Sequence, residues 1–297
     1  MWWKGERTTS VWFGAHESIA GGIDKAIERA LQVGCDALQV FTKSNNQWKA
    51  RPLSDAEVEA FQRRWQESGL RIVVAHDSYL INLASPDDAL WEKSIAAFRE
   101  ELERCERLGI PYLVTHPGAY GTSSLEEGIR RIAEALNRVH AELPGYRVVT
   151  LLETTAGQGT TIGARFEELA AITERIREPE RIAYCFDTCH VFAAGYELTT
   201  PDGYAQTMAE FDNVLGLDRL RVFHLNDSKR ERGSRVDRHE HIGKGKIGLE
   251  GFRQLVNDPR FQHHPALLET EKSQDLHEDR ENLQVLRSLV QQVSDGQ

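Results

Sequence analysis

The 297-residue sequence contains few cysteines and no long apolar segment. Its four cysteines form no Cys-x-x-Cys pair, which excludes the paired-thiol motifs of zinc ribbons and redox proteins. No apolar run is long enough to cross a bilayer, and the first residues lack the apolar core of a secretory signal. Free thiols fit a reducing compartment. We therefore expect a cytoplasmic protein with no membrane partner.

The sequence also lacks a spacer that would mark a domain boundary. Apolar, β-rich runs alternate along it with amphipathic stretches. Strands are predicted at 11–16, 37–42, 71–76, 112–116, 147–153, 182–187, 219–225 and 266–270. Helices are predicted at 20–33, 54–68, 88–108, 124–142, 165–176, 203–215, 249–257 and 277–292.

Near-continuous apolar strands are typical of a parallel sheet that is buried on both faces. Eight βα units in succession predict closure of that sheet into a (β/α)8 TIM barrel. Such a barrel normally takes about 250 residues. Because no Pro/Gly/Ser-rich spacer or low-complexity tract divides the sequence, we expect a single domain over residues 1–297.

Nine side chains that can bind metals recur at the ends of these strands or in the loops that follow. They are His76, His116, Glu153, Asp187, His190, His224, Asp237, His239 and Glu269. In a TIM barrel the chemistry collects at the carboxyl ends of the strands, so the nine are expected on one rim. Their imidazoles and carboxylates suit zinc, and the set is too large for one ion, since a catalytic zinc usually takes three protein ligands plus water. The sequence predicts a multi-zinc active site at the C-terminal rim.

Single members of this set are weak evidence. A histidine at a strand end, such as His76, is more often a hydrogen-bonded structural residue, and His116 before a proline could simply shape a turn. Asp187 and His190 are stronger, because a carboxylate at a strand end and an imidazole one short turn later can point into the same cavity. The order of the nine on successive strands makes coincidence a poor explanation.

The net charge of −10 does not by itself indicate an anionic partner. Between Lys229 and Lys246, however, seven Lys and Arg residues outnumber three acidic residues. A charged run alone is usually a solvated loop, but this one contains Asp237 and His239 at alternate positions, where both can face one ion while Arg238 faces elsewhere. Bound zinc would add positive charge to the same cleft, so this segment is predicted to be functional.

The remaining histidines and the cysteines are not expected to bind metal. We expect His16 to be structural or to support a ligand from behind, and His241 to orient its loop. Cys185 and Cys189 flank Asp187, but the carboxylate is the better ligand candidate. Four histidines are expected to face solvent, namely His140, His263, His264 and His277.

Several long motifs occur in the sequence in a fixed order. They are Phe41-Thr-Lys, His76-Asp-Ser-Tyr-Leu-Ile-Asn-Leu83, His116-Pro-Gly, Leu152-Glu-Thr-Thr-Ala-Gly-Gln-Gly159, Phe186-Asp-Thr-Cys-His-Val-Phe-Ala-Ala-Gly-Tyr196, His224-Leu-Asn-Asp-Ser-Lys229, Ser234-Arg-Val-Asp-Arg-His239 and Leu268-Glu-Thr270. These motifs resemble the signatures of endonuclease IV, the zinc-dependent apurinic/apyrimidinic endonuclease family, from about residue 11 to residue 290. Each of the nine zinc ligands of the family has a counterpart here.

The resemblance implies three zinc ions per chain and a division of the nine ligands among them. One zinc would be held by His76, His116 and Glu153, a second by Glu153, Asp187, His224 and Glu269, and a third by His190, Asp237 and His239. Glu153 would bridge the first two ions, and a hydroxide shared by two zinc ions is available near neutral pH. The implied reaction is a DNA-repair cleavage of the phosphodiester 5′ to an abasic site, which leaves a 3′-hydroxyl and a 5′-deoxyribose phosphate.

The resemblance also implies residues that contact double-stranded DNA at abasic sites. Tyr79, Leu80 and Gln47 match the family positions that fill the gap in the base stack when the abasic sugar is turned out. Asn46 stands where characterised relatives place an arginine that enters the stack, so the wedge here is shorter and uncharged. Arg238 is expected to contact the DNA as well. No partner subunit is required, so a monomer is expected, associated with the nucleoid when it acts on DNA.

Two other functions stay open at this stage. Sugar isomerases and epimerases share the barrel and a metal set that resembles Glu153, Asp187, His224 and Glu269, but they would not need a third site. A damaged-DNA-binding protein that has lost catalysis is the other alternative, although no ligand is missing from the sequence. Zinc stoichiometry and cleavage of abasic DNA separate these functions.

Overall fold

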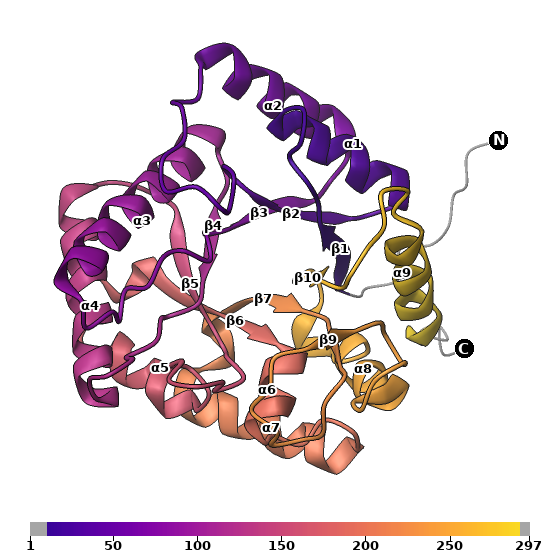
Figure 1. Cartoon of the computed structure of the whole chain (residues 1–297). Coiled ribbons are helices and arrows are strands. Elements are labelled where there is room, and N and C mark those ends of the chain that lie inside the picture. The colour runs from indigo at the N-terminus through magenta and orange to yellow at the C-terminus, as the bar shows by residue number, and fades with distance from the viewer. Residues whose placement is uncertain (1–10, 292–297) are drawn as a thin grey trace.

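A closed barrel of eight parallel strands lies at the centre of the molecule (Figure 1). The computed structural model describes residues 11–291. Around the barrel the strands follow the order β1-β10-β7-β6-β5-β4-β3-β2, so each strand pairs with its sequence neighbour and β10 closes onto β1. The strands are β1 (Trp12–His16), β2 (Ala37–Phe41), β3 (Ile72–His76), β4 (Tyr112–Thr115), β5 (Val149–Glu153), β6 (Ile182–Asp187), β7 (Leu220–His224) and β10 (Pro265–Leu268).

Helices surround the strands, as Figure 1 shows in a view along the barrel. They are α1 (Ile23–Val33), α2 (Asp55–Ser68), α3 (Asp88–Leu108), α4 (Leu125–Glu142), α5 (Phe166–Thr173), α6 (Thr188–Ala194), α7 (Pro201–Leu215), α8 (Gly248–Val256) and α9 (His277–Leu289), with short 3₁₀ turns at Pro179–Arg181, Leu217–Arg219 and Pro259–Phe261. None of the helices within residues 11–291 is both long and apolar enough to span a membrane.

Local sequence signals set the ends of several helices. Ser54 caps α2 in a capping box with Glu57, and the Ser124 side chain accepts the N–H of Glu127 at the start of α4. Gly34 and Gly109 end α1 and α3 in the left-handed conformation that glycine adopts without strain. These caps fix where the helices begin and end around the barrel.

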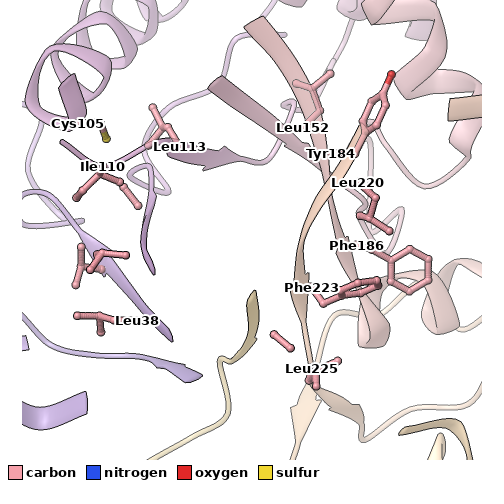
Figure 2. Packing of buried hydrophobic residues seen from close by; sticks show 14 of the residues in the cluster. Leu38, Cys105, Ile110, Leu113, Leu152, Tyr184, Phe186, Leu220, Phe223 and Leu225 are labelled. Atoms are coloured by element: carbon pink, nitrogen blue, oxygen red, sulfur yellow. The ribbon is translucent and has the colours of Figure 1, made fainter. Parts of the chain in front are cut away.

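Two separate apolar layers form because successive strand residues point to opposite faces. Outward-facing residues pack against the helices, and Figure 2 shows Tyr184, Phe186 and Phe223 on that side of their strands. The rings of Phe186 and Phe223 lie 5.8 Å apart. The inward layer consists of Ala37, Val74, Val114, Leu151, Ala183, Cys185, Val222 and Leu267, all buried. The barrel interior is therefore filled beneath its rim.

The predicted TIM barrel is confirmed, with the eight predicted strands in place and their ends shifted by one or two residues. Besides the short 3₁₀ turns, the helix α6 and the two short strands β8 (Asp227–Ser228) and β9 (His239–Glu240), which pair antiparallel, were not predicted. The helix begins at the residue after β6 with no intervening loop, and two-residue strands are too short to show a period.

The predicted solvent exposure of His140 is wrong. Its side chain is buried on the inward stripe of α4, which also carries Leu136 and Val139. Burial lowers the pKa of His140 to about 4, so the ring is neutral at neutral pH. His264 is half-buried, and its Nε2 lies 3.0 Å from the carbonyl oxygen of Leu220. His263 and His277 are exposed, as predicted.

We predict that Gly14→Ala destabilises the barrel where β1 meets its neighbours. An added Cβ would overlap the carbonyl oxygen of Ala37 on β2 and would lie 2.9 Å from Leu267 Cδ2 on β10. Because a backbone oxygen cannot rotate away, we expect a loss of about 3 kcal/mol in the free energy of unfolding, the upper end for overpacking. Gly69→Ala is the control: it faces open space and carries only a left-handed backbone, which costs about 1 kcal/mol. Urea denaturation of both variants checks this, and equal losses would contradict it.

Candidate metal centre

Eight polar side chains form a ring at the carboxyl end of the barrel, one from each strand or the residue just after it. Each stands two residues beyond an inward-facing residue on the same strand, so each points toward the barrel axis above the apolar layer. The ring consists of His16, Gln39, His76, His116, Glu153, Asp187, His224 and Glu269. Six of the nine predicted ligands are therefore brought together by strand period alone.

The first group of ligand atoms surrounds one oxygen of Glu153. Nε2 of His76 lies 3.2 Å and Nε2 of His116 lies 3.1 Å from Glu153 Oε2. Glu153 is completely buried, while the His116 side chain is 37% exposed. These three residues can hold one metal ion that remains open to solvent on the His116 side.

The second group uses the other oxygen of the same carboxylate. Nδ1 of His224 lies 2.9 Å from Glu153 Oε1, 3.3 Å from Glu269 Oε2 and 3.8 Å from Asp187 Oδ2. Ligand atoms of Glu153, Asp187, His224 and Glu269 all lie within 4.8 Å of one another. Since each oxygen of Glu153 faces a different group, this side chain can bridge two ions.

The third group lies beside the ring and is built from loop and helix residues. Nε2 of His190, on α6, is 3.1 Å from Asp237 Oδ2 and 3.4 Å from Nε2 of His239. Nε2 of His239 is 3.3 Å from Asp237 Oδ1. These three predicted residues therefore also converge, although two of them come from the long segment after β7.

Asp227 holds that long segment in place. Its buried carboxylate accepts N–H groups from Ser228, Gly243, Gly245, Ile247 and Gly248. β8 and β9 pair at its base, with Ser228 opposite His239. The loop is thus fixed at both ends, which gives His239 a defined position.

Hydrogen bonds to backbone carbonyls orient three of the imidazoles. Nδ1 lies 2.8 Å from Asp77 O in His76, 2.8 Å from Thr154 O in His190 and 3.1 Å from Glu269 O in His239. An imidazole that donates its Nδ1–H outward presents Nε2 to the site. In His76 and His239, Nε2 is the atom that faces the neighbouring carboxylates. In His190, Nε2 faces Asp237, while Nδ1 also lies 3.3 Å from Glu153 Oε1.

Asp187 is held by two further contacts. Its Oδ1 accepts the N–H of His190 and so caps the first turn of α6. Its Oδ2 accepts from Nδ2 of Asn226 at 2.8 Å. The predicted placement of His190 one short turn after Asp187 is produced by this cap.

The charges of the cluster compensate one another. Burial acts to lower the pKa of His76, but the hydrogen bond and charge of Glu153 raise it to about 9. Burial likewise opposes protonation of His239, yet the charge of Asp187 and the bond to Asp237 raise its pKa to about 9. Burial acts to raise the pKa of Glu269, and the neighbouring His224 holds it at about 2. A cation that binds near neutral pH must therefore displace protons from imidazoles.

The residues predicted to contact DNA lie on exposed loops around this centre. Tyr79 is 67% exposed, and its ring lies edge-on against the ring of Phe41, with centroids 5.5 Å apart. Leu80 is half-buried, and Asn46 and Gln47 are exposed. Ser78 Oγ donates to Asn45 O at 2.6 Å, which ties the two loops together.

Arg238 belongs to a different part of the rim. It is exposed and lines a cavity of about 200 Å³ together with His116, Gln158, His190 and Asp237. Larger pockets lie on the outer surface, one of about 500 Å³ between α3 and residues 48–53, and contain no predicted ligand. The small cavity is the candidate entrance to the metal centre, because His116, His190 and Asp237 line it.

Two buried residues were missed by the sequence analysis. Asp227 lies in the motif from His224 to Lys229, but its role as an acceptor of N–H groups depends on the fold of the loop. Gln39 stands two residues after inward-facing Ala37, so the strand period could have found it. The four cysteines are free and buried, and burial raises the pKa of Cys185 and of Cys189 to about 12. Both lie within reach of the ligand groups, and the expectation that neither binds metal stays a prediction.

Comparisons with known proteins agree with this geometry. A family model described as a xylose isomerase-like TIM barrel matches residues 27–289. A protein of Chloroflexus aurantiacus named probable endonuclease 4 is 56% identical over 279 residues, which cover 94% of this chain and 98% of that protein. This chain belongs to the endonuclease IV family. A Geobacter sulfurreducens member of the same name is 55% identical, covering 94% of each. The predicted family resemblance is confirmed.

Solved structures give the same family. The crystal structure of endonuclease IV from Thermus thermophilus aligns with a TM-score of 0.83 at 40% identity and covers 94% of this chain and 98% of that one. A D-psicose 3-epimerase aligns with a TM-score of 0.68 but at 16% identity, over 94% of this chain and 99% of that one. The latter likeness shows the shared barrel alone.

We predict that a strong chelator lowers the melting temperature of the purified protein. An ion whose free concentration is 100 times its Kd stabilises the folded state by about 2.7 kcal/mol. Removal of the ion also leaves the buried carboxylates without a cation. Calorimetry with and without chelator measures the effect, and re-addition of the metal at pH 7 should release protons. His116→Ala should reduce the shift, whereas His263→Ala, at an exposed position, should not. An unchanged melting temperature in chelator would contradict a metal centre.

Proposed function

We propose that this chain is a zinc-dependent DNA repair endonuclease. It hydrolyses the phosphodiester 5′ to an abasic site and leaves a 3′-hydroxyl and a 5′-deoxyribose phosphate. The observation that carries this proposal is the convergence of three groups of ligand atoms on one rim, two of them sharing the Glu153 carboxylate. Membership of the endonuclease IV family supports it.

The donor set fits zinc. Imidazole nitrogens and carboxylate oxygens are zinc ligands, and three protein ligands are typical of a zinc ion that also holds water or substrate. In this assignment the first ion is held by His76, His116 and Glu153. The second takes Glu153, Asp187, His224 and Glu269, and the third takes His190, Asp237 and His239. Three zinc ions per chain follow from this division.

The protein's own residues set the conditions for the reaction. Glu153 holds its two oxygens toward two groups, and it is completely buried between them. The carbonyl-bound imidazoles of His76, His190 and His239 keep their Nε2 atoms aimed inward. Zinc bound there lowers the pKa of water and offsets the charge that builds on a phosphate during hydrolysis. Glu153 is accordingly the residue we assign to catalysis.

Substrate recognition is assigned to two sets of residues on the rim. Tyr79 and Leu80, with Asn46 and Gln47 on the tied neighbouring loop, are placed to fill the gap beside an abasic sugar. Arg238 and the exposed basic residues of 229–246 are placed to contact phosphates. The duplex would therefore lie across the rim between these two sets.

Further properties complete the proposal. The nine ligands come from one chain, which supports an active monomer with no required protein partner. Four free cysteines fit a reducing compartment and support a cytoplasmic location. We also propose that residues 1–297 form a single endonuclease domain.

We predict that Glu153→Gln abolishes cleavage of an abasic duplex. The amide keeps the shape but removes the charge that faces two metal groups, so kcat should fall on the order of 10³-fold or more. The assay uses a duplex with one abasic site, and elemental analysis of the same samples counts zinc. Glu103→Gln, on the exposed face of α3, is the control and should cleave normally.

Wild-type protein should carry about three zinc ions per chain, as the proposed ligand division requires. A stoichiometry near one without nicking would instead indicate a sugar isomerase. Unaltered cleavage by Glu153→Gln would sink the assigned mechanism.

We predict that Tyr79→Ala weakens recognition of the abasic site and leaves the metal centre intact. An aromatic that replaces a base in the stack contributes about 1–3 kcal/mol, so KM should rise about tenfold while zinc content stays unchanged. Leu31→Ala, at another apolar exposed position on α1, is the control. Kinetics on abasic and intact duplexes measure the effect. Equal KM values for Tyr79→Ala and the control would show that the Tyr79 ring is not part of the wedge.

A further inference from the structure

The strands β1 and β2 contribute no predicted ligand, yet each places a polar side chain in the ring. Gln39 on β2 is completely buried, and His16 on β1 is paired with it in register. A buried carboxamide must have its donors and acceptor satisfied. The partners of Gln39 show what it does.

Both ends of the Gln39 carboxamide contact the second ligand group. Its Nε2 donates to Glu269 Oε1 at 2.6 Å and lies 3.0 Å from Nδ1 of His16. Its Oε1 lies 2.8 Å from Nε2 of His224. One neutral side chain therefore links a carboxylate and an imidazole of the same group.

The chemistry of these partners fixes the direction of every hydrogen bond. The ionised Glu269 can only accept, so the atom that faces it must be the amide nitrogen of Gln39. The amide oxygen then faces His224 and accepts its Nε2–H. His224 is left with Nδ1 as the atom that presents a lone pair to a metal, and Nδ1 is the atom that lies 2.9 Å from Glu153 Oε1.

His224 differs in this respect from three of the other imidazoles. His76, His190 and His239 are held through Nδ1 by backbone carbonyls and present Nε2. In His224 the two nitrogens exchange these roles. Its Nε2 is bound by the side chain of Gln39, and its Nδ1 faces Glu153. Its tautomer and its ring orientation depend on residue 39, which substitution can change.

We propose that Gln39 is a positioning residue of the metal centre, which orients His224 and Glu269 together for the ion that they share with Glu153 and Asp187. This inference rests on the metal centre of the proposed function. Gln39 acts through the two ligands, as outer partners of metal-bound histidines do.

The test uses Gln39→Met, which keeps the length of the side chain and removes both its acceptor and its donor. We expect the affinity for one metal ion per chain to fall about 10- to 100-fold in chelator competition with Zn²⁺. The Co²⁺-loaded variant should show an altered visible absorption spectrum, because the coordination of the second group changes. The other ions should bind as in the wild type.

Thr150→Val is the matched control. Thr150 is equally buried, lies on β5 three residues from Glu153, and has no hydrogen-bond partner for its hydroxyl among the described residues. We expect wild-type metal affinity and an unchanged Co²⁺ spectrum from it. Melting of each protein in chelator reports on folding without metal, and Gln39→Met should then melt close to the control.

Gln39→Glu tests the same claim by a second route and serves if Gln39→Met does not fold. It keeps an acceptor for His224 but replaces the donor to Glu269 with a carboxylate that repels it, so one ion should bind more weakly than in the wild type and the Co²⁺ spectrum should change. The proposal is overturned if the folded variants bind every ion with wild-type affinity and spectrum. Metal binding that depends on Gln39 without abasic-site cleavage would uphold the inference and overturn the proposed function.

Discussion

The buried carboxylate of Glu153 is the constraint on which the rest of the site depends. A charge removed from water is tolerated only when several partners compensate it. Here His76 and His116 face one oxygen, and His224 faces the other. The site is thus organised around one carboxylate, and each of its two oxygens contacts a different group of side chains. The barrel makes this possible, because strands from distant parts of the sequence end around one axis.

The fold and most of the centre could be predicted because both follow from short-range rules. Strand period carries polar residues from the apolar layer to the rim, which placed His76, His116, Glu153, Asp187, His224 and Glu269 without knowledge of any contact. Asp237 and His239 were predicted from alternation in a loop, but their final position depends on the amide cradle around Asp227 and on β8–β9 pairing, which sequence does not reveal. His140 was misread because the inward stripe of α4 extends to the last turn of that helix. Gln39 was missed because a neutral amide is not a metal ligand, and its role exists only through partners 185 and 230 residues away in the sequence.

Gln39 suits its position because its carboxamide is uncharged and can both donate and accept a hydrogen bond. It contacts an anion, Glu269, and an imidazole that must present a lone pair to a metal, so it has to donate at one end and accept at the other. A carboxylate there would repel Glu269, and a cation would compete for the same ligands. The neighbouring His16 fits this balance, because burial lowers its pKa to about 3. Its ring therefore stays neutral, and its Nδ1 can accept from Gln39.

The same balance explains how a chain with a net charge of −10 can approach a polyanion. Four carboxylates of the proposed metal centre lie on the rim, and when no cation is bound their charge is offset by protons on neighbouring imidazoles such as His76 and His239. In the proposed function, divalent ions would displace those protons, and each would bring two positive charges, so the rim would become more positive. The basic residues of 229–246 extend this positive region outward from Asp237 and His239. Because attraction to DNA acts over about one Debye length, roughly 8–10 Å at physiological salt, the local charge at the rim counts for more than the acidic residues on the far helices.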